Sequence, residues 1–148
     1  MEAGKGAHLR ALARGFRRIW GPFLTREEKA RIVAAGAEQN SRATGKIHVL
    51  VVAHAGEMDI LTLARRRFIS LGLHKNSERN DVLILISWSD RRFAIWGDEA
   101  IHASVGQPLW ERATETLTAH FASERYADGI VACVRDIGTE LAKHFPRT

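Results

Sequence analysis

The sequence predicts an α/β fold, a three-layer α/β/α sandwich on a small mixed β-sheet with an N-terminal amphipathic helix. Two nearly continuous apolar runs, 47–52 and 82–86, are typical of strands whose two faces are both covered. A helical pattern over 58–73 separates them, and parallel strands need such a crossover. A short polar turn after the second run leads to 92–96, which predicts an antiparallel hairpin. The sheet is therefore expected to combine a βαβ unit with a hairpin.

The first helix of the domain is expected over 25–43. Thr25 and Glu28 have the spacing of a capping box, in which each residue satisfies a backbone N–H of the other. Gly45 follows the pattern and is of the type that ends helices. These signals predict a folded domain over residues 25–148.

Two helices are expected after the hairpin. Asp98 opens a short helical turn that carries His102. Gly106 and Pro108 end this turn and start a long helix, since proline suits the first helical position. Ser123 is expected to cap the last helix, whose apolar residues recur at spacings of three and four.

The composition indicates one soluble globular domain. The chain has 148 residues, 45% of them hydrophobic and 26% charged, and no apolar run is long enough to span a membrane. Its one cysteine, Cys133, excludes an internal disulfide and a cysteine-based zinc site, and it falls on an apolar helical stripe. We therefore expect an inert core thiol and a cytoplasmic protein, with any membrane contact peripheral.

The net charge of +5 belongs to the N-terminal segment. Residues 1–26 hold six Lys and Arg residues against one Glu, and the rest of the chain carries equal numbers of cations and anions. The folded body is therefore neutral, and nucleic acid is not the expected partner.

Residues 1–24 are predicted to form a basic amphipathic extension that breaks at Gly21-Pro22. The pattern is compatible with a helix docked on the domain, with attachment to an anionic membrane surface, and with contact to a phosphate-rich partner. An organellar transit peptide has a similar composition, whereas a secretory signal peptide would need a longer apolar core.

Several short motifs are shared with one known family. They are 44–45, Phe68, 79–84, 92–95, 97–102, 105–106 and 126–130. Through them the region 25–145 resembles the TPM domain family, and looks most like its short, stand-alone branch. Many members have Asp-Asn-Gly where this chain has Arg79-Asn80-Asp81, so an arginine stands on an acidic position.

The resemblance implies an α/β/α sandwich on a mixed sheet. It also implies candidate functions, because some members bind calcium or a similar divalent ion near the strand ends. Some plant members are described as acid phosphatases, and others serve the maintenance of photosystems or membrane complexes. We therefore expect a divalent cation, calcium or magnesium, as the candidate cofactor, and no organic cofactor.

Four candidate metal ligands fall at one end of the predicted sheet. Asp81 enters the central strand and Asp98 leaves the antiparallel third strand, so both belong to the same end. Glu99 adjoins Asp98, and His102 shares a helical face with it. Carboxylate and imidazole groups suit a divalent ion, although Asp98 also suits a simple N-cap. Arg79 is the candidate contact for a phosphate or another anion.

Two functions are compatible with these residues. The first is a non-enzymatic module that binds a divalent cation, or that acts as an accessory to a protein or membrane complex. The alternative is a metal-dependent acid phosphatase that uses the same acids, with Arg79 on the phosphate. The sequence contains no P-loop, no Ser-His-Asp order and no HExxH, and it shows no defined nucleophile. The binding module is therefore the favoured interpretation, and neither catalytic residues nor a protein partner is identified.

Overall fold

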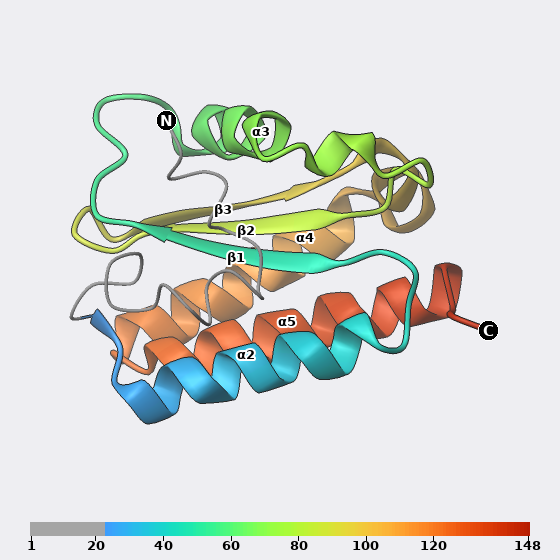
Figure 1. The fold of residues 1–148 in the computed structure, drawn as a ribbon. Coiled ribbons are helices and arrows are strands. Elements are labelled where there is room, and N and C mark those ends of the chain that lie inside the picture. Colours follow the sequence, from blue (N-terminus) through green and yellow to red (C-terminus); the bar gives the residue numbers. More distant parts are fainter. Residues whose placement is uncertain (1–22) are drawn as a thin grey trace.

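The computed structural model describes residues 23–148, and they form three layers (Figure 1). A three-stranded sheet lies in the middle, with α3 on one face and α2, α4 and α5 on the other. This arrangement confirms the predicted α/β/α sandwich on a small mixed sheet. Residues 1–22 of the amphipathic extension predicted over 1–24 lie outside the described residues, and so do the predictions that depend on its helix.

The elements follow the predicted order. They are α2 (Arg26–Asn40), β1 (Ile47–Val52), α3 (Ile60–Ser70), the 3-10 turn η3 (Leu73–Lys75), β2 (Val82–Ser87), β3 (Arg92–Gly97), α4 (Glu99–Ala122) and α5 (Tyr126–His144). The sheet order is β1-β2-β3, with β1 parallel and β3 antiparallel to the central β2. No helix of the described residues is both long and apolar enough to cross a membrane.

The alternation of side chains along the strands produces a separate core on each face of the sheet. Leu83 and Leu85 of β2 pack with Phe68 of α3 on one face. Ile84 and Ile86 of the same strand join the larger core formed with α2, α4 and α5. All six residues of β2 are buried, which explains the uninterrupted apolar run over 82–86.

The start of α2 follows the prediction, but its end does not. Thr25 and Glu28 form the expected capping box, with the Glu28 N–H donating to Thr25 Oγ1 at 3.1 Å. The helix then ends at Asn40 with Ser41 as its C-cap, so the predicted extension to residue 43 is wrong. Gly45 is not a helix terminator either. A Cβ there would lie 2.3 Å from the carbonyl oxygen of Asn80, so glycine permits close passage of two chain segments.

The helices after the hairpin show one confirmation and one correction. Gly106 has φ 72° and ψ 178°, so it breaks α4 between its first turns and its long C-terminal part, as predicted. Ser123 does not cap the last helix, because it is the C-cap of α4, and α5 begins after Arg125. Cys133 is fully buried in α5, where burial raises the pKa of its thiol. It is therefore the expected inert core residue.

Candidate functional site

The predicted site residues lie where β2 begins and β3 ends. Asp81 precedes β2 and Asp98 follows β3, and the backbone N–H of Asp98 donates to the carbonyl oxygen of Asp81 at 3.0 Å. The two acids therefore share one end of the sheet, as the antiparallel pairing required. We call this region, Arg79 to Asp81 with Asp98 to His102, the polar end.

An arginine fork dominates the polar end. Arg79 Nε and Nη2 donate to the two carboxylate oxygens of Asp98, each at 2.8 Å. Arg79 Nη1 also lies 3.1 Å from Glu99 Oε2. Hydrogen bonding to Asp98 raises the pKa of Arg79, so the guanidinium is charged at all relevant pH values. The Asp98 carboxylate is buried, and it also caps α4 by accepting from the Glu99 N–H at 2.8 Å.

The Asp81 side chain turns towards β1 instead. Its Oδ1 accepts from the Lys46 N–H at 3.0 Å and from Asn76 Nδ2 at 2.8 Å. Its Oδ2 lies 3.0 Å from Nε2 of the buried His48. Burial alone would raise the pKa of Asp81, but the hydrogen bond and the charge of His48, with the Lys46 and Asn76 bonds, hold it below its usual range.

His102 is held by an aromatic neighbour. The indole Nε1–H of Trp110 donates to His102 Nδ1 at 2.9 Å, so this bond requires the proton on the other ring nitrogen. Trp110 itself covers Gly97, where a Cβ would lie 2.3 Å from the indole ring. Because Gly97 has no side chain, the Trp110 ring can pack against the end of β3, where it donates its hydrogen bond to His102.

These side chains border a groove of about 510 Å³ between α3 and the start of α4. Arg79, Asp98, Glu99 and His102 all line it, whereas Asp81 does not. The groove also contains side chains that the sequence analysis did not assign to a site, namely Arg65, Phe68, Ile69, His74 and Trp96. The structure therefore brings four of the five candidate residues together around the groove, and the fifth, Asp81, lies outside its lining.

The oxygens of the two candidate aspartates are already engaged within the chain. Among residues 23–148, no three His, Cys, Asp or Glu side chains form a group that could hold a metal ion. Both oxygens of Asp98 already accept from Arg79, and both oxygens of Asp81 have hydrogen-bond partners. The Arg79 guanidinium therefore already supplies a positive charge beside the Asp98 carboxylate.

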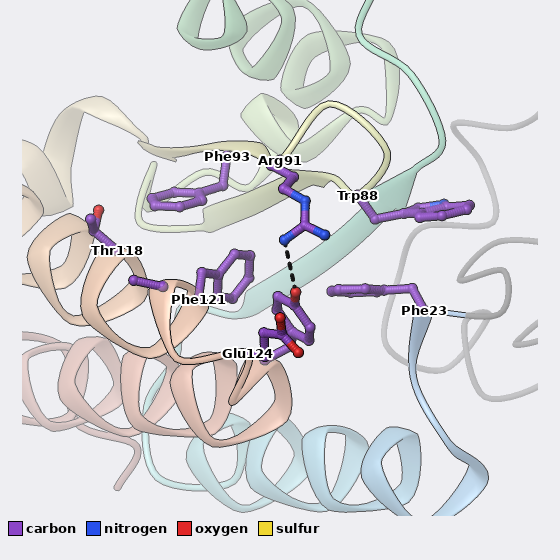
Figure 2. Close-up of a pocket in the computed structure, with 9 residues that line it drawn as sticks. Phe23, Trp88, Arg91, Phe93, Thr118, Phe121 and Glu124 are labelled. Atoms are coloured by element: carbon purple, nitrogen blue, oxygen red, sulfur yellow. Dashed lines mark hydrogen bonds between the residues drawn. The ribbon is translucent and has the colours of Figure 1, made fainter.

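A second cavity, of about 360 Å³, lies at the opposite end of the sheet (Figure 2). We call it the aromatic pocket, because it is lined by Phe23, Trp88, Phe93, Phe121 and Tyr126. Arg91 of the β2–β3 hairpin also borders it. The sequence analysis missed this pocket. The available signal was a tryptophan and an arginine flanking a short polar turn, which by itself does not indicate a site.

A small mixed sheet between α3 on one face and α2, α4 and α5 on the other defines a small three-layer α/β domain. The family model of the TPM domain matches residues 22–140, and the chain therefore belongs to the TPM domain family. The resemblance seen in the motifs is thus confirmed. No curated protein matches the chain significantly.

Solved bacterial structures have the same fold. The NMR structure of the BA42 protein from the psychrophilic bacterium Bizionia argentinensis aligns with a TM-score of 0.79 at 29% identity, over 86% of this chain and 88% of that chain. The N-terminal domain of the cg2496 protein from Corynebacterium glutamicum gives 0.63 at 15% identity, over 80% and 74%. The N-terminal domain of a P. gingivalis protein gives 0.69 at 15% identity, over 84% and 80%. The last two similarities concern the fold alone.

Proposed function

We propose that this domain is a non-enzymatic binding module that docks a protein partner in the groove at the polar end. The observation that supports this is the forked ion pair of Arg79 with Asp98. Because the pair satisfies the buried carboxylate from within the chain, the acids of the polar end act as structural supports for the groove wall.

The chemistry of the groove suits a protein ligand. Phe68 and Trp96 provide an apolar floor, and Ile69 at its edge is 43% exposed, one of two large exposed apolar side chains in the described part of the chain. Arg65 adds a cationic group beside this floor. A partner segment that presents an apolar side chain next to a carboxylate would complement both features. Such docking is consistent with an accessory role in a protein or membrane complex.

Cation binding and phosphatase activity are the competing functions. A divalent cation at Asp98 would have to displace the Arg79 guanidinium, so the two are mutually exclusive at that carboxylate. The phosphatase alternative has one favourable observation, since Arg65, Arg79 and His102 border one groove and could contact a phosphate. It would also require a nucleophile or a metal-bound water at that place.

The direct test is site-specific photo-crosslinking in cells of the source organism. Ile69 and Leu61 are matched positions, because both lie on α3 and are 43% and 46% exposed, but only Ile69 lines the groove. A photoreactive residue at 69 should give a discrete adduct that one at 61 does not, and Trp96→Ala should abolish it. Equal labelling from both positions would contradict docking in the groove.

A second experiment addresses the competing functions. The full chain is titrated with calcium, magnesium and zinc by NMR, and a phosphomonoester is assayed with each metal. Saturable shifts at Asp98, Glu99 and His102 would replace protein docking by cation binding. Metal-dependent turnover that Asp98→Asn abolishes would establish the phosphatase alternative.

A further inference from the structure

The aromatic pocket has the construction of a small-molecule site. The rings of Phe23 and Tyr126 lie 4.9 Å apart, those of Phe121 and Tyr126 5.1 Å, and those of Phe93 and Phe121 5.2 Å. Two of these three pairs are edge-to-face, the geometry in which aromatic quadrupoles attract. The cavity of about 360 Å³ that they border is within the range of ligand pockets. The walls thus offer both ring faces and ring edges to an aromatic guest.

A cationic group stands at the rim of this apolar space (Figure 2). Arg91 Nη1 donates to the hydroxyl oxygen of Tyr126 at 3.0 Å. No carboxylate of residues 23–148 pairs with Arg91, in contrast to Arg79 at the other end. The guanidinium keeps its other N–H groups, and the Tyr126 O–H, which accepts from Arg91, keeps its proton for another acceptor. Two donors therefore converge on the mouth of the cavity.

The backbone holds this arginine in an uncommon conformation. Arg91 has φ 55°, and Glu124, which borders the same pocket, has φ 60°. Only three non-glycine residues of the described chain have positive φ, and two of them lie here. Such conformations are unfavourable for residues other than glycine, and they are concentrated at binding sites.

We propose that the aromatic pocket binds a small aromatic monocarboxylate, with its ring among Phe93, Phe121 and Tyr126 and its carboxylate on Arg91 and the Tyr126 hydroxyl. A guanidinium and a hydroxyl are matched to the two oxygens of one carboxylate. The exposed Glu124 at the same rim disfavours a second negative charge, so a monoanion binds better than a phosphate dianion. This site lies at the opposite end of the sheet from the groove at the polar end and is independent of the function proposed there.

The test is an NMR titration of the full chain with phenylacetate and three matched probes: 2-phenylethanol, phenethylamine and acetate. Phenylacetate should shift the Trp88 indole and the Phe93 and Phe121 amides in a saturable way. 2-Phenylethanol lacks the negative charge, phenethylamine carries a positive one, and acetate lacks the ring. Each should bind about tenfold or more weakly than phenylacetate. Phenyl phosphate should bind more weakly than phenylacetate.

Two variants assign the donors. Arg91→Gln should weaken phenylacetate about tenfold and leave 2-phenylethanol unchanged, and Tyr126→Phe should weaken phenylacetate about threefold while keeping the ring. The control is Arg135→Gln, which removes the same charge from the exposed face of α5. It should change neither the affinity for phenylacetate nor that for 2-phenylethanol.

Three results would overturn the proposal. The first is equal affinity for phenylacetate and 2-phenylethanol. The second is unchanged phenylacetate binding by both Arg91→Gln and Tyr126→Phe. The third is an absence of ligand-induced shifts at the pocket. This result includes the case in which Phe93 and Phe121 show nuclear Overhauser contacts to residues 1–22, because the N-terminal extension would then occupy the pocket.

Discussion

Two arginines in nearly the same backbone conformation stand at opposite ends of this sheet. Arg79 at the polar end has φ 54° and Arg91 at the aromatic pocket has φ 55°. Arg79 is bound to both oxygens of a buried carboxylate, whereas Arg91 donates to a neutral hydroxyl. The first charge is neutralised inside the domain and the second is available to a ligand. The same residue type therefore supports structure at one end and recognition at the other.

The difference predicts how each end responds to substitution. Changes at the polar end should lower the free energy of unfolding, because buried polar groups would lose their partners. Changes at the aromatic pocket should leave stability nearly constant and affect binding. The following measurements compare the two ends directly.

The largest effect is expected for Asp81→Ala. This change removes the acceptor of the Lys46 N–H, Asn76 and the buried His48. Leaving such groups buried without their partner should lower the free energy of unfolding by about 3 kcal/mol in urea denaturation. Asp136→Ala, on the exposed part of α5, should change it by less than about 0.5 kcal/mol. Similar losses for both variants would mean that Asp81 is not a structural support.

Gly97→Ala should have the next largest effect. The new Cβ would meet the Trp110 ring at 2.3 Å, so the end of β3 or the indole must move, at about 2 kcal/mol. The measurement is urea denaturation in the wild-type and Trp110→Leu backgrounds. The smaller side chain should remove most of the loss, and an equal loss in both backgrounds would contradict the packing explanation.

Arg91→Gly and Arg79→Gly should shift stability in opposite directions. Glycine relieves the backbone strain of a positive φ at either position, but it also makes the unfolded chain more flexible. The relief of strain is the larger effect, so Arg91→Gly should raise the free energy of unfolding by about 0.5 kcal/mol. Arg79→Gly should destabilise, because it also leaves the buried Asp98 carboxylate without its partner. Destabilisation by both changes would remove the contrast between the two arginines.

The smallest effect is expected in the pH dependence of the hairpin. Hydrogen bonds from the Ala55 N–H and Ser87, followed by Arg92, lower the pKa of Asp90 to about 2 from 3.8. A depressed pKa stabilises the fold above the unfolded value, and the stabilisation is lost as the pH falls from about 3.8 towards 2. Urea denaturation between pH 5 and pH 3 should therefore show a shallower loss for Asp90→Asn than for the wild type. Parallel losses would contradict the assignment.

Much of the fold was predictable because its signals are local or simply periodic. The bounds of β1 and the start of α2 follow from an apolar run and a capping box, which depend on neighbouring residues. The shared end of Asp81 and Asp98 follows from the hairpin alone. The wrong assignments were Gly45 and Ser123, whose roles depend on Asn80 and on the end of α4, and neither contact can be deduced from a local pattern.

The two sites differ in predictability for the same physical reason. The polar end consists of residues 79–81 and 98–102, which flank one hairpin, so the sequence around that hairpin identifies all of them. The aromatic pocket joins the first residues of the domain, the hairpin and the ends of two helices, which only tertiary packing brings together. The ion pair of Arg79 with Asp98 was also not predictable, because the sequence indicated only that Arg79 could contact an external anion.

The break at Gly106 has an evolutionary consequence. A continuous α4 would join His102 at the polar end rigidly to Phe121 at the aromatic pocket, so a substitution that shifted one would shift the other. The left-handed glycine divides the helix into two segments that can adjust separately. Mutations that adapt one end to a new partner can therefore accumulate without being selected against at the other end.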